Sequence, residues 1–193
     1  MFLGKRKNIK VTCSIILKVI FLLVLFYNTA GAVGRDELRL KAGLDLFPSL
    51  LTADLDILKK QEDGYLTIVF LYRDNRKQAS MMAKDLAEMK KIREIPIRIE
   101  ITDDPNMEMY KNKSPAGIFI TQRLDNKLSN VVDYAVKNSV ILFSPFKGDV
   151  EKGVMGGISI SDRVRPYINK ASMESSKIKI KQFYMRVSLI YEP

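Results

Sequence analysis

The sequence predicts an α/β fold: a largely parallel sheet with helices on both faces, followed by a C-terminal hairpin and a closing helix. Short, nearly continuous apolar runs alternate along the chain with segments whose apolar residues recur at helical spacing. This alternation is typical of parallel sheets covered by helices. Because the strand-like runs are apolar on both faces, we expect them to be buried between two helical layers. The 193 residues, 47% of them hydrophobic, are enough for one such domain.

Residues 1–32 are predicted to form a secretory signal peptide. They carry five basic and no acidic residues, then the apolar run 19–27, then small residues at Ala30 and Ala32. This order is that of a cleavable signal, and the run is shorter than the roughly 20 residues that span a bilayer. We therefore expect residues 33–193 to be a single domain located in the periplasm. The alternative is that the N-terminal segment stays as a membrane anchor.

Removal of this segment changes what the composition implies. The formal charge falls from +10 to +5, and the only cysteine, Cys13, is lost. The sequence has no histidine, which excludes a Ser-His-Asp triad, a Cys-His pair and an HExxH zinc site. We expect no enzymatic activity, no metal and no cofactor; the alternative is catalysis by a Ser-Lys pair or by acidic residues alone. A charge of +5 without a nucleic-acid-binding motif also predicts no nucleic-acid partner.

Helices and strands are predicted to alternate through the first half of the domain. Apolar residues at helical spacing over 35–60 indicate helix, which we expect Pro48 to divide into two. The apolar run 65–71 predicts a buried strand, and the alternating run 95–101 predicts a strand near a sheet edge. Between them, an amphipathic helix is predicted to start at Asp74-Asn75 and to end near Glu94. We expect the methionines of this helix to fill the core: Met81, Met82 and Met89.

The second half continues the alternation and then changes character. The next strand, helix and strand are predicted at 116–121, 125–137 and 139–143. A glycine-rich loop over 146–157 follows, and two short apolar runs after it indicate a hairpin. Asn169 is placed to cap a short helix. The remaining predicted elements are the hairpin strands 158–161 and 164–168, the short helix 170–175, an exposed strand 177–181 and the closing helix 182–190.

The glycine loop has the spacing of a phosphate-binding loop without its chemistry. Gly148 and Gly153 are spaced as in a Walker A motif. Val154 and Met155, however, occupy the positions of the lysine and the hydroxyl that bind phosphate and magnesium. We therefore expect these glycines to form structural turns.

Charged residues supply the candidate contacts. Arg163 and Arg165 flank one residue and so share a strand face, where they could bind an anion or a protein. The alternative is a solvated edge whose charges oppose strand aggregation. We expect two acidic pairs, Asp54 with Asp56 and Asp103 with Asp104, to be structural, because they lack the further oxygen ligands or the common face that a site needs. The loop adds the other predicted partner or anion contacts: Phe146, Lys147, Gly156 and Gly157.

The C-terminal third resembles the YfiR/HmsC-like periplasmic family. The segments 140–146, 153–158 and 164–169 repeat its order of buried strand, serine-containing turn, glycine turn and hairpin, before a closing helix. The resemblance implies an exported regulator that restrains an inner-membrane diguanylate cyclase by binding its periplasmic part. The family's disulfide-based redox control is not implied, since residues 33–193 contain no cysteine. Phe47-Pro48 also replaces the Trp-Pro that the family has after its first helix.

These observations predict an exported binding protein. The leading hypothesis is a regulator that contacts the periplasmic part of an inner-membrane signalling or transport protein. The alternative is a small-solute-binding accessory protein, because one lobe of such proteins has the same strand–helix alternation. A large closed pocket would favour the solute binder, whereas an exposed apolar patch would favour the regulator. The sequence leaves open whether the chain forms a homodimer.

Overall fold

A computed structural model describes residues 34–193 of the chain. The chain divides into two compact units, Met1–Leu38 and Arg39–Pro193. Of the first unit, only residues 34–38 are described, and they are helical; the predicted signal peptide, residues 1–32, lies outside the described residues. Among the residues that are described, no helix combines the length and the apolar character that crossing a bilayer requires.

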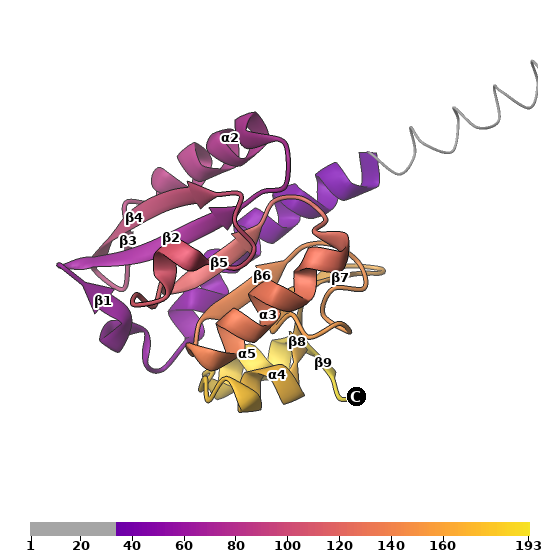
Figure 1. The fold of residues 1–193 in the computed structure, drawn as a ribbon. Coiled ribbons are helices and arrows are strands. Elements are labelled where there is room, and N and C mark those ends of the chain that lie inside the picture. Colours follow the sequence, from indigo (N-terminus) through magenta and orange to yellow (C-terminus); the bar gives the residue numbers. More distant parts are fainter. Residues whose placement is uncertain (1–33) are drawn as a thin grey trace, which may run out of the picture. The chain divides into compact units, whose positions relative to one another are not determined.

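A nine-stranded, mostly parallel sheet organises residues 39–193 (Figure 1). The five central strands, which are neighbours from β4 to β7, run parallel, as do β8 and β9 at one edge. The pairings of β1 with β2, β3 with β4 and β7 with β8 are antiparallel. The predicted α/β class is therefore confirmed. In spatial order the strands are β3 (Lys91–Ile92), β4 (Ile95–Thr102), β2 (Tyr65–Leu71), β5 (Gly117–Ile120), β6 (Ile141–Ser144), β7 (Gly156–Ile160), β8 (Val164–Asn169) and β9 (Leu189–Tyr191), with β1 (Gln61–Glu62) beside β2.

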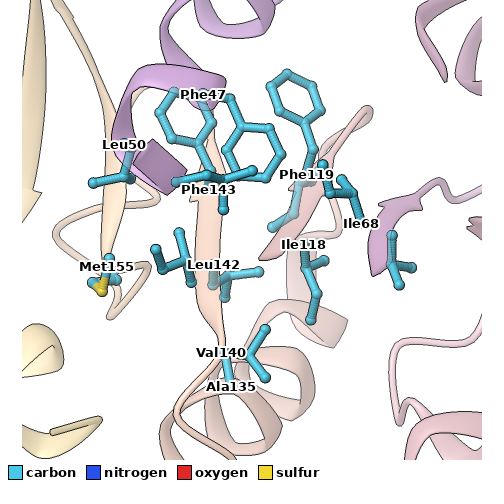
Figure 2. Close-up of a cluster of buried hydrophobic side chains, with 14 of the residues drawn as sticks. Phe47, Leu50, Ile68, Ile118, Phe119, Ala135, Val140, Leu142, Phe143 and Met155 are labelled. Carbon is cyan, nitrogen blue, oxygen red and sulfur yellow. The ribbon is translucent and has the colours of Figure 1, made fainter. Parts of the chain in front are cut away.

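Helices cover both faces of this sheet. Phe119 of β5 lies on the face covered by the helix of residues 39–53, whereas Ile118 lies on the opposite face, toward Ala135 of α3 (Leu128–Lys137) (Figure 2). The helix α2 (Arg76–Ala87) packs against β4 and β2. Asn169 caps its helix as predicted, and Asn75, at the predicted start of α2, caps that helix too; both side chains accept hydrogen bonds from backbone N–H groups. The other helical segments are α4 (Lys170–Ser175), α5 (Gln182–Val187) and the 3₁₀ helices η1 (Ile57–Lys60), η2 (Glu108–Tyr110) and η3 (Asp125–Lys127).

Phenylalanines and small residues join the first helix to the sheet. The ring of Phe47 lies 5.4 Å from the rings of both Phe119 and Phe143, and all three side chains are fully buried. Glycines let the helix approach the strands closely. A Cβ atom on Gly117 would lie 2.7 Å from Leu51, so a larger residue there would push the helix away. The predicted strands in this region, 116–121 and 139–143, are confirmed as β5 and β6 with small shifts of their ends.

Pro48 does not divide the first helix, and that prediction was wrong. Residues 39–53 form one uninterrupted helix through Pro48. A proline inside a helix costs about 3 kcal/mol, because it removes a hydrogen bond and crowds the preceding turn. Its neighbours Phe47, Leu50 and Leu51 are fully buried against the sheet. Burial of three large side chains offsets that cost at about 1.5–3 kcal/mol each.

The helix predicted to reach Glu94 ends earlier. α2 stops at Ala87, and the chain turns into the short hairpin of β3 and β4. Ile92 is buried there as a strand residue. Its position continues the apolar spacing of α2, so the sequence pattern alone extends the helix too far. Of the methionines predicted to fill the core, Met82 is buried, but Met81 and Met89 are 58% and 46% exposed. The prediction was therefore wrong for these two methionines.

The C-terminal segment also departs from prediction. Residues 177–181 form no strand, and only Ile180 makes an isolated bridge, to Asp54. The closing helix ends at Val187, and the last residues form β9 beside β8. The alternating run 177–181 instead packs its isoleucines against the core as an irregular segment. The hairpin of β7 and β8, by contrast, is confirmed.

Candidate functional site

The carboxyl edge between β2 and β5 is where sheets of this kind usually bind ligands, since the chain leaves these strands in opposite directions. Here the side-chain oxygen of Gln122 accepts hydrogen bonds from the backbone N–H groups of Arg73, Asp74 and Asn75, at 2.9, 3.0 and 2.9 Å. The Gln122 amide donates to Asp74 at 2.7 Å, and Arg73 forms an ion pair with Asp125 at 2.7 Å. The polar groups at this edge therefore satisfy one another. We do not place the site there.

The predicted contact residues are distributed over several environments. Lys147 and Arg163 are exposed, and Arg165 is partly buried with an Nε atom that has no hydrogen-bond partner among the described residues. Gly156 and Gly157 belong to β7 rather than to the loop predicted over 146–157, and both are buried. A Cβ atom on Gly157 would lie 2.7 Å from the Ser144 carbonyl oxygen. These two glycines therefore serve strand packing and offer no side chain to a partner.

Phe146 is also buried, with the Arg123 guanidinium 5.1 Å from its ring centre. Together with Lys147 it lines an open cavity of about 270 Å³ between the 146–151 segment and β7, where Arg39 donates to the Pro145 and Ile158 carbonyls at 2.6 and 2.8 Å. Arg163, Arg165 and the two glycines are not among its lining residues. The cavity has charges of both signs, because Glu151 lines it together with Arg39 and Lys147. It therefore brings together only two of the six predicted contacts.

A buried hydrogen bond holds the loop beside this cavity. The hydroxyl of Ser144 donates to the Asp149 carboxylate at 2.6 Å, and both side chains are buried. Burial raises the pKa of Asp149, an effect that the Ser144 hydrogen bond and the charges of Arg123 and Lys152 only partly oppose. The positive φ angles of Gly148 and Gly153, 93° and 105°, form the turns on either side.

Replacing Asp149 by asparagine is expected to flatten the dependence of stability on pH. Since the pKa of Asp149 is raised on folding, its contribution is fully present below the unfolded pKa and is lost as pH rises through the folded pKa. The free energy of unfolding of Asp149→Asn should therefore fall less than that of the wild type between acidic and neutral pH. Urea unfolding at a series of pH values measures this, with the exposed Asp133→Asn as the control. Parallel profiles for Asp149→Asn and the wild type would contradict the expectation.

A second hollow, of about 280 Å³, combines apolar and basic side chains; we call it the basic groove. Three segments far apart in the sequence form it: the end of the first helix, the turn between α2 and β4, and the start of α5. Phe183 and Met89 stand at the groove with 60% and 46% of their surface exposed, although both are large and apolar. Its lining residues are Pro48, Ser49, Thr52, Ala53, Met89, Lys91, Ile92, Arg93, Lys181 and Phe183.

The charges of the basic groove all have one sign. Lys91, Arg93 and Lys181 line it, and no acidic residue is among its described lining residues. Lys91 forms an exposed ion pair with Glu94 at 3.5 Å. Within the part of the chain that the structure describes, neither Arg93 nor Lys181 has an ion-pair partner. The groove therefore presents two uncompensated cations beside exposed apolar surface.

The turn that forms one wall of the groove is held in an uncommon backbone conformation. Lys90, Arg93 and Glu94 have φ angles of 60°, 46° and 68°, in the left-handed region that favours glycine. Arg93 and Glu94 form the two-residue connection between β3 and β4, for which Asn-Gly is the usual sequence. Such conformations cost about 1–3 kcal/mol each and concentrate at functional sites. The turn thus keeps Arg93 at the groove at the expense of local stability.

Residues of both acidic pairs take part in local ion pairs and turns. Asp54 forms a buried ion pair with Lys60 at 2.8 Å, and Asp56 an exposed one with Lys59 at 2.6 Å. Asp104 accepts hydrogen bonds from the backbone N–H groups of residues 106 and 108, which is turn chemistry. Among the described residues, no group of three or more acidic or cysteine side chains lies together as a metal site would require.

Comparison with known proteins adds little beyond the fold. No protein-family model and no curated protein matches the chain. A solved structure of an ABC domain in complex with L-Trp from Streptococcus pneumonia is 12% identical, with a TM-score of 0.49 over 74% of this chain and 60% of that chain. A conserved domain protein from Vibrio cholerae is 11% identical, with a TM-score of 0.48 over 72% of this chain and 58% of that chain. The chain thus spans about three fifths of the length of these two proteins. At this identity and TM-score, the similarity does not indicate a shared ligand.

Proposed function

We propose that this chain is an exported regulatory protein that acts by binding the periplasmic part of an inner-membrane signalling or transport protein. The observation that carries the proposal is the basic groove, where Phe183 and Met89 are exposed beside unpaired cations. Exposed aromatic and methionine side chains next to arginine are typical of protein-binding surfaces. The resemblance to the YfiR/HmsC-like family supports a diguanylate cyclase as the class of partner.

The hollows of the described domain fit a contact surface better than an enclosing pocket. The basic groove and the cavity at Phe146 measure about 280 and 270 Å³, and both open to solvent. Small-molecule sites usually enclose about 300–1,000 Å³ and bury most of their ligand. The solute-binding alternative would use the cavity at Phe146, whose walls carry both signs of charge.

Affinity capture from membranes of the native organism tests the proposal. We expect wild-type protein to retain a membrane protein, and Phe183→Ala to retain at least tenfold less, because truncation of a hot-spot residue at an interface costs about 2 kcal/mol or more. Met109→Ala is the matched control, since Met109 is 77% exposed but does not line the groove. Failure to capture a membrane protein, together with a small ligand that raises the melting temperature, would favour the solute binder.

A further inference from the structure

We infer that the basic groove recognises an acidic, apolar segment of its partner: a stretch of chain in which carboxylates flank one or more large apolar side chains. This inference rests on the proposed function, because it names the chemistry of the partner at the same surface. It goes further in one respect, since a regulator could bind through apolar contacts alone.

The charge of the groove selects the sign of the partner. Arg93 and Lys181 have no ion-pair partner among the described residues, and Lys91 shares its charge with the exposed Glu94. Bringing a basic segment to these cations would place like charges together, which disfavours binding. A carboxylate would instead complete ion pairs at a partly desolvated rim, where a guanidinium can bind both oxygens of the carboxylate. The groove therefore discriminates against basic partners.

The apolar surface of the groove favours large apolar side chains between the carboxylates of the bound segment. Ala53 and Ile92 are buried beneath it, while Met89 and Phe183 are exposed beside it. A large aliphatic or aromatic side chain placed here would remove apolar surface from water on both molecules. Ser49 and Thr52 add hydroxyl groups that can hydrogen-bond to the backbone of a bound segment. Charge and apolar surface thus select different parts of one segment.

A protein segment fits the groove better than an anionic membrane does. The site is a hollow formed by three separate parts of the chain, whereas a bilayer presents a broad surface that cannot enter it. The backbone of Arg93 is held in a two-residue turn with a left-handed conformation, which limits where its guanidinium group can reach. Binding to a membrane surface depends instead on several mobile basic residues in one plane. We therefore commit to the protein segment and treat lipid as an outcome of the test.

Fluorescence anisotropy with labelled peptides tests the inference. The exported protein is titrated with three short peptides of equal length, composed of glutamate and leucine, lysine and leucine, or glutamate and serine. We expect the first to bind at least tenfold more tightly than either of the others. Its affinity should fall as salt is raised, since rim charges are screened. Equal binding of the glutamate–leucine and lysine–leucine peptides would overturn the inference.

Charge reversal locates the effect. The double variant Arg93→Glu, Lys181→Glu is expected to prefer the lysine–leucine peptide, and the neutral pair Arg93→Gln, Lys181→Gln should lose the preference without reversing it. The matched control, Lys127→Glu with Lys137→Glu, changes the net charge equally at two exposed positions outside the groove and should behave as wild type. Melting temperatures verify that each variant folds. A control that reverses as strongly as the groove variant would overturn the assignment.

Three further outcomes test this inference and the proposed function separately. Tighter binding to phosphatidylglycerol vesicles than to any peptide, abolished by the groove variant, would show a lipid surface and overturn the inference. If membrane capture depends on Phe183 while the peptides bind without a preference for acid, the inference fails and the proposed function stands. If the acidic peptide is preferred but membrane capture does not depend on the groove, the proposed function fails.

Discussion

Phe47→Ala is expected to lower the free energy of unfolding by about 4 kcal/mol. The Phe47 ring is fully buried and lies 5.4 Å from the rings of both Phe119 and Phe143, on strands β5 and β6. Its removal leaves a cavity between the first helix and the centre of the sheet (Figure 2). Gly117, whose added Cβ would lie 2.9 Å from the Phe47 ring, shows how closely the two layers already pack. The surroundings can therefore collapse only in part, and most of the cost remains.

Urea unfolding measures this loss as a lower midpoint at an unchanged slope. A domain of ordinary stability, about 5–15 kcal/mol, would lose a large share of it. Leu58→Ala is the matched control, because Leu58 is 55% exposed and its removal should change stability by less than about 0.5 kcal/mol. A Phe47→Ala cost as small as that of the control would show that the first helix is not packed on the sheet as described.

Lys60→Met is expected to cost about 3–5 kcal/mol, because it leaves a buried carboxylate without its counter-ion. Lys60 Nζ lies 2.8 Å from Asp54 Oδ2, and the Asp54 side chain is only 1% exposed. The Oδ1 atom of Asp54 also accepts the backbone N–H of Asp56 at 2.9 Å, and Asp54 bridges to Ile180. The ion pair thus joins the end of the first helix to η1, and the backbone of Asp54 separately bridges to the C-terminal segment that precedes α5.

Lys59→Met provides the control for this pair. Lys59, the residue before Lys60, forms an ion pair with Asp56 at 2.6 Å, but its side chain is 79% exposed and that of Asp56 is 36% exposed. Exposed pairs contribute about 0–1 kcal/mol, so this variant should remain close to wild type in thermal or urea unfolding. The double variant Asp54→Asn, Lys60→Met should recover part of the loss, since no buried charge then remains. Equal costs for Lys59→Met and Lys60→Met would contradict the role of burial.

The sequence predicts the centre of the fold well, because strands buried on both faces appear in the sequence as continuous apolar runs. The segment 65–71 is apolar at nearly every position and forms β2, whose residues from Leu66 to Leu71 are all buried. At the periphery, local preference and tertiary packing compete. Pro48 has poor helix propensity, yet burial of Phe47 and Leu50 keeps the helix intact. Residues 189–191 pair with β8 as the strand β9, although the sequence pattern predicts one helix over 182–190.

The candidate site was harder to predict because it exists only after folding. The loop and hairpin predictions pointed to residues close together in the sequence, such as Arg163 and Arg165, which are separated by one residue. The basic groove instead joins Pro48, Arg93 and Phe183, and no spacing in the sequence relates these three. Local signals were also missing, since Arg93-Glu94 adopts a turn that normally takes Asn-Gly. Phe183 is an aromatic residue on the exposed face of the short helix α5. It is the residue of the groove that an analysis of the predicted helix could have singled out.

The most direct test of the central claim, that the basic groove is the contact surface, is site-specific photo-crosslinking in living cells of the native organism. A photoreactive residue at position 183 should give a discrete adduct with a membrane protein, and one at position 109, which is more exposed but lies outside the groove, should not. Adding Arg93→Glu should abolish the adduct at position 183. Adducts at position 109 alone, or none at position 183 while the protein is folded, would contradict the account.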